Sequence, residues 1–120
     1  MKDTTLVLGA SLKEERYSNK AIKRLVNKGY KVKAIGVREG EVSGIQIETE
    51  KEVVNSVDTV TMYLSAKHQP DYYNYILQLE PGRVIFNPGT ENPELIALLK
   101  NNNIHVELAC TLVLLTTEQY

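Results

Sequence analysis

The stretch LVLGASLKEERYSNKAIKRLV, from Leu6 to Val26, decides the fold class of this chain. Its apolar start ends in a glycine, which is typical of a strand that enters a loop. Further on, apolar residues recur at the spacing of one helical face, at Ala21, Ile22, Leu25 and Val26. Strand, loop and helix in this order are typical of the first unit of a nucleotide-binding α/β domain. The loop is unusual, because Gly9 is its only glycine and the dinucleotide motif G-x-G-x-x-G is absent.

The rest of the chain repeats this alternation. After the first strand at 4–9, apolar and β-branched runs predict strands at 30–37, 58–64, within 81–89 and at 104–109, with a short extended piece at 45–47. Helical spacing and capping residues predict helices at 18–29, 68–79 and 92–103, with Ser18 and Asn92 as caps. Thr49 and Glu52 have the spacing of a capping box, which predicts one more short helix. Residues 110–116 fit a helix or a strand.

Strands that alternate with helices imply right-handed crossovers and a parallel sheet that is covered on both faces. We therefore predict a Rossmann-like α/β fold with three layers, in which a mostly parallel sheet of five or six strands carries helices on both faces. No linker, repeat or low-complexity stretch divides the sequence, so residues 1–120 are expected to form one domain.

Composition excludes several classes of protein. The formal net charge of -1 argues against a general binder of nucleic acids or anionic membranes, which normally carries a basic excess. Cys110 is the only cysteine, so no internal disulfide can form, and no Cys/His cluster indicates a metal site. The apolar run at 6–8 is too short for a signal peptide, and TLVLL is too short to span a bilayer. The expected compartment is the cytoplasm.

The carboxyl ends of parallel strands meet at one edge of a sheet, where α/β proteins bind ligands. The loop after the first strand brings Gly9, Ala10 and Ser11 to this edge, followed by Arg16 and Ser18 at the start of the helix. Backbone amides, hydroxyls and cations of this kind suit a pyrophosphate. The alternative is a solvated connection in which the cations lie among Glu14 and Glu15.

The other three strand ends add candidate contacts. A dinucleotide site normally has an acidic residue after the second strand, but this chain has Val37 and Arg38 there. An arginine favours a phosphorylated ribose, although for this residue alone a surface pairing with Glu39 or Glu41 is the better explanation, because such pairs are frequent. The later strand ends place two further groups at the edge, at Tyr63 and Leu64 and at Asn87, Pro88 and Gly89.

No catalytic constellation is evident. His68 and His105 lie in a helix-start region and a strand, and they do not form an obvious pair of base and nucleophile. No G-x-S-x-G motif is present. Cys110 fits a small buried hydrophobe better than a reactive thiol, because nothing nearby in sequence would lower its pKa. We predict neither catalytic nor metal-binding residues.

The chain resembles the small stand-alone CoA-binding domain proteins, which are similar to the CoA-binding N-terminal domain of the succinyl-CoA synthetase α subunit. The resemblance covers nearly the whole chain. Its segments are VLGAS, RYSNKAIKRLVNKGYKV, GIQIETEKEV, VDTVTMYL, VIFNPGTENPELIALLKNNNIHVE and ACTLVLL. The chain departs from the common family pattern at Tyr17, where a proline is frequent, and at 35–37, where Val-Asn-Pro is frequent.

The resemblance implies a site for coenzyme A or an acyl-CoA at the strand ends. By position, the pyrophosphate would meet Gly9, Ala10, Ser11, Arg16 and Ser18. The ribose 3′-phosphate would lie near Val37 and Arg38. The pantetheine arm would follow Tyr63, Leu64, Asn87, Pro88 and Gly89. The histidine that the synthetase phosphorylates belongs to another domain, so the resemblance implies no ligase activity.

Three functions remain open on the sequence. The first is non-catalytic binding of CoA or acyl-CoA by a carrier, sensor or regulatory module. The second is an NAD(P)-dependent oxidoreductase, against which the missing glycines count. The third is a protein-interaction domain without a ligand. A homodimer or a partner enzyme fits each of them, whereas nucleic acid and membrane are not expected as partners.

Overall fold

A computed structural model describes residues 4–120 of the chain. Seven strands form one sheet in this part: β1 (Thr4–Ala10), β2 (Lys31–Gly36), β3 (Gly40–Val42), β4 (Ile45–Glu48), β5 (Val57–Met62), β6 (Arg83–Phe86) and β7 (His105–Leu108). Four α-helices accompany them: α1 (Tyr17–Asn27), α2 (Tyr73–Leu79), α3 (Pro93–Asn101) and α4 (Thr111–Thr116). None of the helices in this part is long and apolar enough to cross a membrane.

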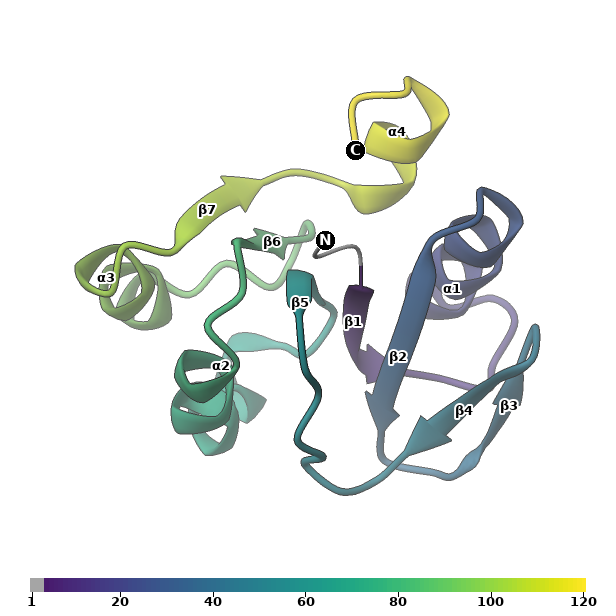
Figure 1. Cartoon of the computed structure of the whole chain (residues 1–120), viewed down its shortest axis with the longest axis horizontal. Helices are drawn as coiled ribbons and strands as arrows, with labels where there is room; N and C mark the ends of the chain where they lie inside the picture. Colours follow the sequence, from purple (N-terminus) through teal and green to yellow (C-terminus); the bar gives the residue numbers. More distant parts are fainter. Residues whose placement is uncertain (1–3) are drawn as a thin grey trace.

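The strand order is β3-β4-β2-β1-β5-β6-β7, and every pair is parallel except β3 with β4 (Figure 1). The chain starts in the middle of the sheet, and the strand order reverses between β1 and β5. The Rossmann-like α/β class is therefore confirmed. The sheet has seven strands rather than five or six, because 40–42 forms a short antiparallel edge strand that the sequence analysis did not identify.

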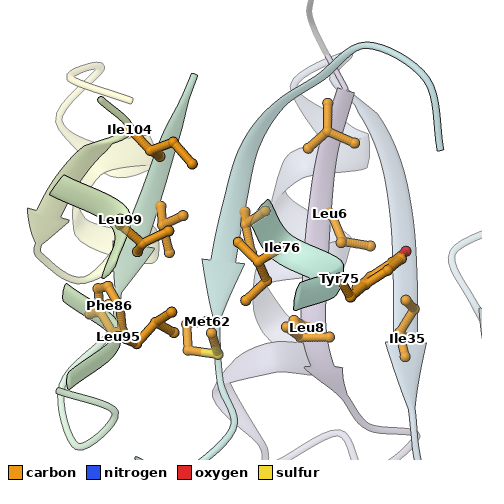
Figure 2. Packing of buried hydrophobic residues seen from close by; sticks show 13 residues of the cluster. Leu6, Leu8, Ile35, Met62, Tyr75, Ile76, Phe86, Leu95, Leu99 and Ile104 are labelled. Atoms are coloured by element: carbon orange, nitrogen blue, oxygen red, sulfur yellow. The ribbon is translucent and has the colours of Figure 1, made fainter. Parts of the chain in front are cut away.

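Both faces of the sheet are buried against helices. Along β1, Leu6 and Leu8 point to one face and Val7 to the other, and all three are fully buried. The first face packs against α2 and α3 through Ile76 and Leu99 (Figure 2). The opposite face packs against α1 and α4 through residues such as Ile22, Leu25 and Leu115. A central parallel strand must be apolar on both faces, which explains the continuous apolar run at 6–8.

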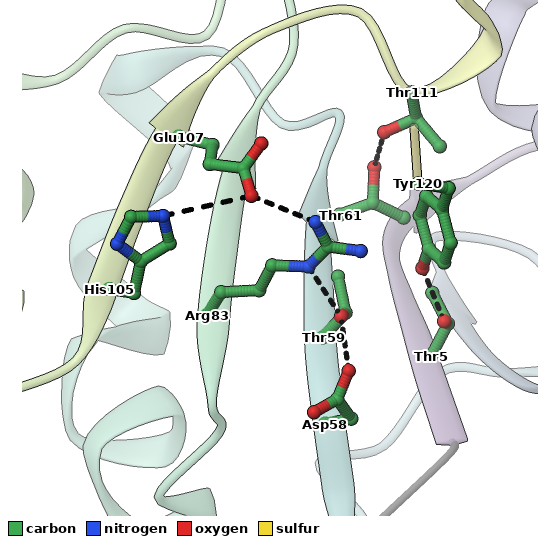
Figure 3. Close-up of polar contacts among 9 residues, drawn as sticks. All are labelled: Thr5, Asp58, Thr59, Thr61, Arg83, His105, Glu107, Thr111 and Tyr120. Atoms are coloured by element: carbon green, nitrogen blue, oxygen red, sulfur yellow. Dashed lines mark hydrogen bonds and ion pairs between the residues drawn. The ribbon is translucent and has the colours of Figure 1, made fainter. Parts of the chain in front are cut away.

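Polar contacts attach the C-terminal segment to the sheet (Figure 3). The Tyr120 hydroxyl forms a short hydrogen bond with Thr5 of β1, and the Arg83 guanidinium lies 4.5 Å from the centre of the Tyr120 ring. Arg83 also donates to Thr59 at 2.9 Å and to Glu107 at 2.8 Å, so it ties β6 to both neighbouring strands. These contacts hold the residues after α4 against β1 and β6.

Helix α3 begins where its sequence predicts, and helix α1 begins close to its predicted start. Asn92 caps α3, because its Oδ1 accepts from the amides of Glu94 at 3.1 Å and Leu95 at 3.3 Å. Helix α1 begins one residue earlier than predicted, at Tyr17. Ser18 is therefore not its cap but lies buried in the first turn. Residues 110–116, whose sequence fits a helix or a strand, contain the helix α4.

The helix predicted after Thr49 does not form, since the structure has no helix between β4 and β5. The segment carries the two glutamates Glu50 and Glu52, and Val53 is 91% exposed, so it offers no continuous apolar stripe to bury. One backbone carbonyl of the segment, that of Glu52, accepts a hydrogen bond from the Tyr75 hydroxyl instead. The predicted helix at 68–79 is also shorter, because two 3₁₀ turns (Ala66–His68 and Pro70–Tyr72) precede α2.

Replacing Ile76 with alanine should lower the free energy of unfolding by about 2–5 kcal/mol, because the side chain is fully buried between α2 and the sheet. Val53→Ala is the matched control, since that β-branched side chain is 91% exposed and should change stability by less than about 0.5 kcal/mol. Urea unfolding followed by circular dichroism measures both. Equal effects of the two substitutions would contradict the packing described here.

Candidate functional site

The carboxyl ends of β1, β2, β5 and β6 border one cleft of about 830 Å³. The four loops predicted to share an edge therefore do share it. Eleven of the twelve residues proposed as ligand contacts line this cleft: Gly9, Ala10, Ser11, Arg16, Ser18, Val37, Arg38, Tyr63, Leu64, Pro88 and Gly89. The twelfth, Asn87, lies behind the lining. Their role in ligand contact stays a prediction, but their gathering in one place is a feature of the fold.

Gly9 has a structural reason to be a glycine. Its φ is +98°, and the β1–β2 register shifts between Leu8 and Ala10. A Cβ at this position would lie 2.9 Å from the backbone of both Tyr63 and Leu64. The end of β1 thus passes too close to the chain after β5 for any side chain. This close approach places the first loop beside the third.

The long first loop is held by polar contacts instead of further glycines. The Asn19 side chain is 1% exposed, and its Nδ2 donates to the Ser11 carbonyl at 2.9 Å. The Ser11 hydroxyl accepts from the Lys13 amide at 3.1 Å, and the Arg16 amide donates to the Lys13 carbonyl at 3.1 Å. Asn19 was not among the predicted site residues, although a polar residue next to the apolar stripe of a helix was a signal for it.

Two buried amide side chains fix the opposite wall. Gln69 is fully buried, and its Nε2 donates to the carbonyls of Leu64 at 2.9 Å and Thr90 at 2.8 Å. Its Oε1 accepts from Asn92 at 3.0 Å. Gln69 therefore joins the loop after β5 to the loop after β6. No pattern in the sequence distinguished it from an exposed glutamine.

Asn87 has a similar role behind the cleft. Its Nδ2 donates to Met62 at 2.9 Å and Thr61 at 2.7 Å, and its Oδ1 accepts from the Thr111 amide at 2.8 Å. Thr61 and Thr111 also bond to each other through their hydroxyls at 2.7 Å (Figure 3). Asn87 thus connects β5, β6 and the start of α4. Its side chain is already engaged in these bonds.

The charged groups of the cleft are all of one sign. Its lining includes Lys13, Arg16 and Arg38 but no aspartate or glutamate. These three cations belong to the loops after β1 and β2. At the other end, the Gly89 amide donates to the Glu91 carboxylate at 2.9 Å. The cleft is therefore cationic at the β1–β2 end, whereas an acidic side chain stands at the β6 end.

Groups suited to acid–base or nucleophilic chemistry do not converge here. His68 lines the cleft, whereas His105 lies on β7, where it is 3.7 Å from Glu107. Burial raises the pKa of the Tyr63 phenol to about 12, so this phenol stays protonated at neutral pH and cannot serve as a base. Cys110 is half-buried at the start of α4 and does not line the cleft. Within residues 4–120, no group of His, Cys, Asp or Glu is arranged to hold a metal ion.

Removing the amide of Gln69 should destabilise the protein, because the carbonyls of Leu64 and Thr90 would lose this donor and the Asn92 amide would keep only its bond to Tyr73. We expect Gln69→Ala to lower the free energy of unfolding by about 2 kcal/mol or more. Gln78→Ala, on the exposed face of α2, is the control and should have little effect. Denaturant titration distinguishes the two. A neutral Gln69→Ala variant would show that this bridge does not support the cleft.

Comparison with known proteins places this architecture in a family. The CoA binding domain model matches residues 3–116. A crystal structure of an uncharacterized protein is 44% identical, with a TM-score of 0.96 over 100% of this chain and 99% of the other. A protein from Thermus thermophilus is 24% identical, with a TM-score of 0.87 over 99% and 91% of the two chains, and shows the fold alone. A search of curated proteins found no match to the sequence.

The donor set of the cleft fits the group that this family binds. Coenzyme A carries a pyrophosphate and a ribose phosphate at one end and an uncharged pantetheine arm at the other. A lining with three cations near β1 and β2 and no carboxylate suits the phosphate end. The resemblance drawn from the sequence is confirmed by the family match: the chain belongs to the CoA binding domain family, and coenzyme A is the ligand class that membership indicates.

Proposed function

We propose that this protein binds coenzyme A or an acyl-CoA in the cleft at the strand ends without catalysing a reaction, and acts as a carrier, sensor or regulatory module. The observation that carries the proposal is the lining, which combines three cations with backbone and hydroxyl groups and contains no carboxylate. Phosphate groups are bound by donor sets of this kind.

The charge distribution supports one orientation of the ligand. Arg16 with the loop Gly9–Ser11 would hold the pyrophosphate, and Arg38 beside Val37 would meet the ribose 3′-phosphate. The pantetheine arm would then run past Tyr63 and Leu64 toward the β6 loop, at Pro88 and Gly89. The acidic Glu91 beside the Gly89 amide supports this direction, because it would repel a phosphate at that end.

The absence of a reactive pair supports the non-catalytic part of the proposal. His68 is exposed, and its side chain makes no hydrogen bond with any residue in 4–120. A general base normally needs a hydrogen-bonded group that orients it. We also propose a cytoplasmic location, for which the single cysteine is the supporting feature.

Arg38 provides the sharpest test of the ligand. We expect CoA to raise the melting temperature more than dephospho-CoA does, because only CoA has the 3′-phosphate. Arg38→Gln should weaken CoA binding about tenfold, roughly 1.4 kcal/mol, and leave dephospho-CoA binding unchanged. Lys100→Gln on α3 makes the same change in charge far from the cleft and should alter neither affinity. Isothermal titration calorimetry of the unmodified protein and both variants with each ligand measures these affinities.

Equal binding of CoA and dephospho-CoA by the unmodified protein would contradict the role given to Arg38. Saturable binding of NADPH in the absence of CoA binding would overturn the proposed function and favour an oxidoreductase-type domain. Native mass spectrometry of the purified protein adds an independent readout. It would reveal a retained CoA or acyl-CoA by its mass and would show whether the protein is a homodimer.

A further inference from the structure

The modest net charge of this protein hides a strong separation of charge along the chain. Residues 13–38 hold nine of the fourteen Lys and Arg residues but two of the fifteen Asp and Glu residues, a local charge of +7. The remaining residues carry five cations and thirteen carboxylates, a charge of -8. The positive segment comprises most of the loop after β1, helix α1, strand β2 and the first two residues of the loop after β2, which together form one side of the cleft.

Within this positive segment, most of the cations that do not line the cleft lie on or next to the outer face of α1. We call this set the α1 stripe: it begins with Arg16 at the cleft and continues along the exposed helix surface through Lys20, Lys23, Arg24 and Lys28. Spacings of three and four residues place these side chains on one face of the helix. The opposite face of α1 carries Ile22 and Leu25 into the core. In Figure 1, α1 lies next to β2.

The α1 stripe is weakly neutralised by the rest of the molecule. Lys23 pairs with Glu14 at 3.1 Å, but both side chains are largely exposed, at 44% and 84%. Arg24 donates to the uncharged Thr116 hydroxyl at 2.9 Å, and Lys20 lies over the Tyr17 ring at 5.4 Å. Exposed pairs of this type contribute little to stability. Contacts that stabilise the folded protein therefore do not explain why cations accumulate on this face of α1.

The stripe is placed to act on a charged ligand at a distance. Helix α1 starts at the cleft, where Arg16, Tyr17 and Ser18 line the wall. At 1.5 Å per residue, Lys23 lies about 9 Å and Lys28 about 17 Å along the axis from that start. The screening length is about 10 Å at 0.1 M salt and about 30 Å at 0.01 M. The charges of the stripe therefore reach the mouth of the cleft without touching a bound ligand.

We propose that the α1 stripe steers the phosphates of CoA toward the cleft and so raises the rate of association. This inference rests on the proposed function, because it takes CoA as the ligand. A field of one sign beside a binding site raises the association rate of an oppositely charged ligand by about 10- to 1,000-fold. It leaves dissociation nearly unchanged, because the distant charges make no contact. The acidic remainder of the molecule strengthens the effect, since it repels CoA from other surfaces.

The test changes charges of the stripe that are remote from the cleft. Lys23→Gln with Lys28→Glu alters the net charge by -3, and so does the control pair Gln78→Glu with Lys100→Glu on α2 and α3. All four positions are exposed. Lys28 follows the last residue of α1 and Lys100 lies in the last turn of α3, so each pair also loses one cation at a helix C-terminus. The dipole cost of the two Lys→Glu substitutions is therefore similar, while Gln78→Glu adds a further carboxylate in the last turn of α2 and so biases the control toward lower stability.

Stopped-flow fluorescence with an etheno-adenine analogue of CoA measures both rates between about 10 mM and 500 mM salt. We expect the stripe variant to bind about fivefold more slowly than the control at low salt, with dissociation rates within twofold of each other. The difference should disappear at high salt, where the charges are screened. Thermal unfolding of both variants confirms that they are folded.

The outcomes separate this inference from the proposed function. Equal association rates of the stripe and control variants, with normal CoA affinity in the unmodified protein, would overturn steering and leave the proposed function intact. Faster dissociation in the stripe variant alone would also overturn steering, since it would indicate direct contact. If the substitutions in the α1 stripe left the kinetics of CoA binding unchanged, the stripe would suit the docking of an acidic protein instead. Failure of the unmodified protein to bind CoA at any salt concentration would overturn both.

Discussion

The close approach of the β1 end to the chain after β5 is the contact on which the rest of the site depends. Gly9 permits it, because a Cβ there would lie 2.9 Å from the backbone of Tyr63 and Leu64. The approach occurs between β1 and β5, where the strand order of the sheet reverses. Brought this close, the first and third loops become two walls of one cleft. A phosphate-binding motif rich in glycine is therefore not needed to build the site.

Buried amide side chains then hold the walls in place. Asn19 fixes the first loop, Gln69 joins the third loop to the fourth, and Asn87 connects both strands behind them to α4. Loss of these hydrogen bonds would leave buried polar groups without partners, so each bond favours one arrangement of the backbone around it. The cleft is thus preorganised by residues that need not touch the ligand.

Cationic side chains and apolar contacts occupy different parts of the molecule. The cations gather in the loop after β1, in α1 and around β2, whereas the apolar contacts run through both faces of the sheet. Neither distribution interferes with the other, because α1 directs Ile22 and Leu25 inward and its charged residues outward. The same helix can therefore stabilise the fold and present a positive surface beside the cleft.

The sequence by itself determined the α/β class, the mostly parallel direction of the strands and the four loops that border the cleft. These follow from local patterns: apolar runs such as 6–8, the helical spacing of Ile22 and Leu25, and the Asn92 cap. Sequence reasoning failed where tertiary contacts compete with local preference. The segment after Thr49 has a capping box but forms no helix, and its Glu52 carbonyl instead accepts a hydrogen bond from Tyr75 on α2.

Only the tertiary structure decided which polar residues lie at the surface and which lie inside. Gln69 and Gln78 are the same residue type in the same region, yet Gln69 is fully buried between two loops and Gln78 is exposed. Asn87 was expected to line the cleft but lies behind it, bonded to Thr61 and Thr111. Burial of a polar side chain depends on partners that are distant in the sequence, such as Thr90 for Gln69, and no local pattern records them.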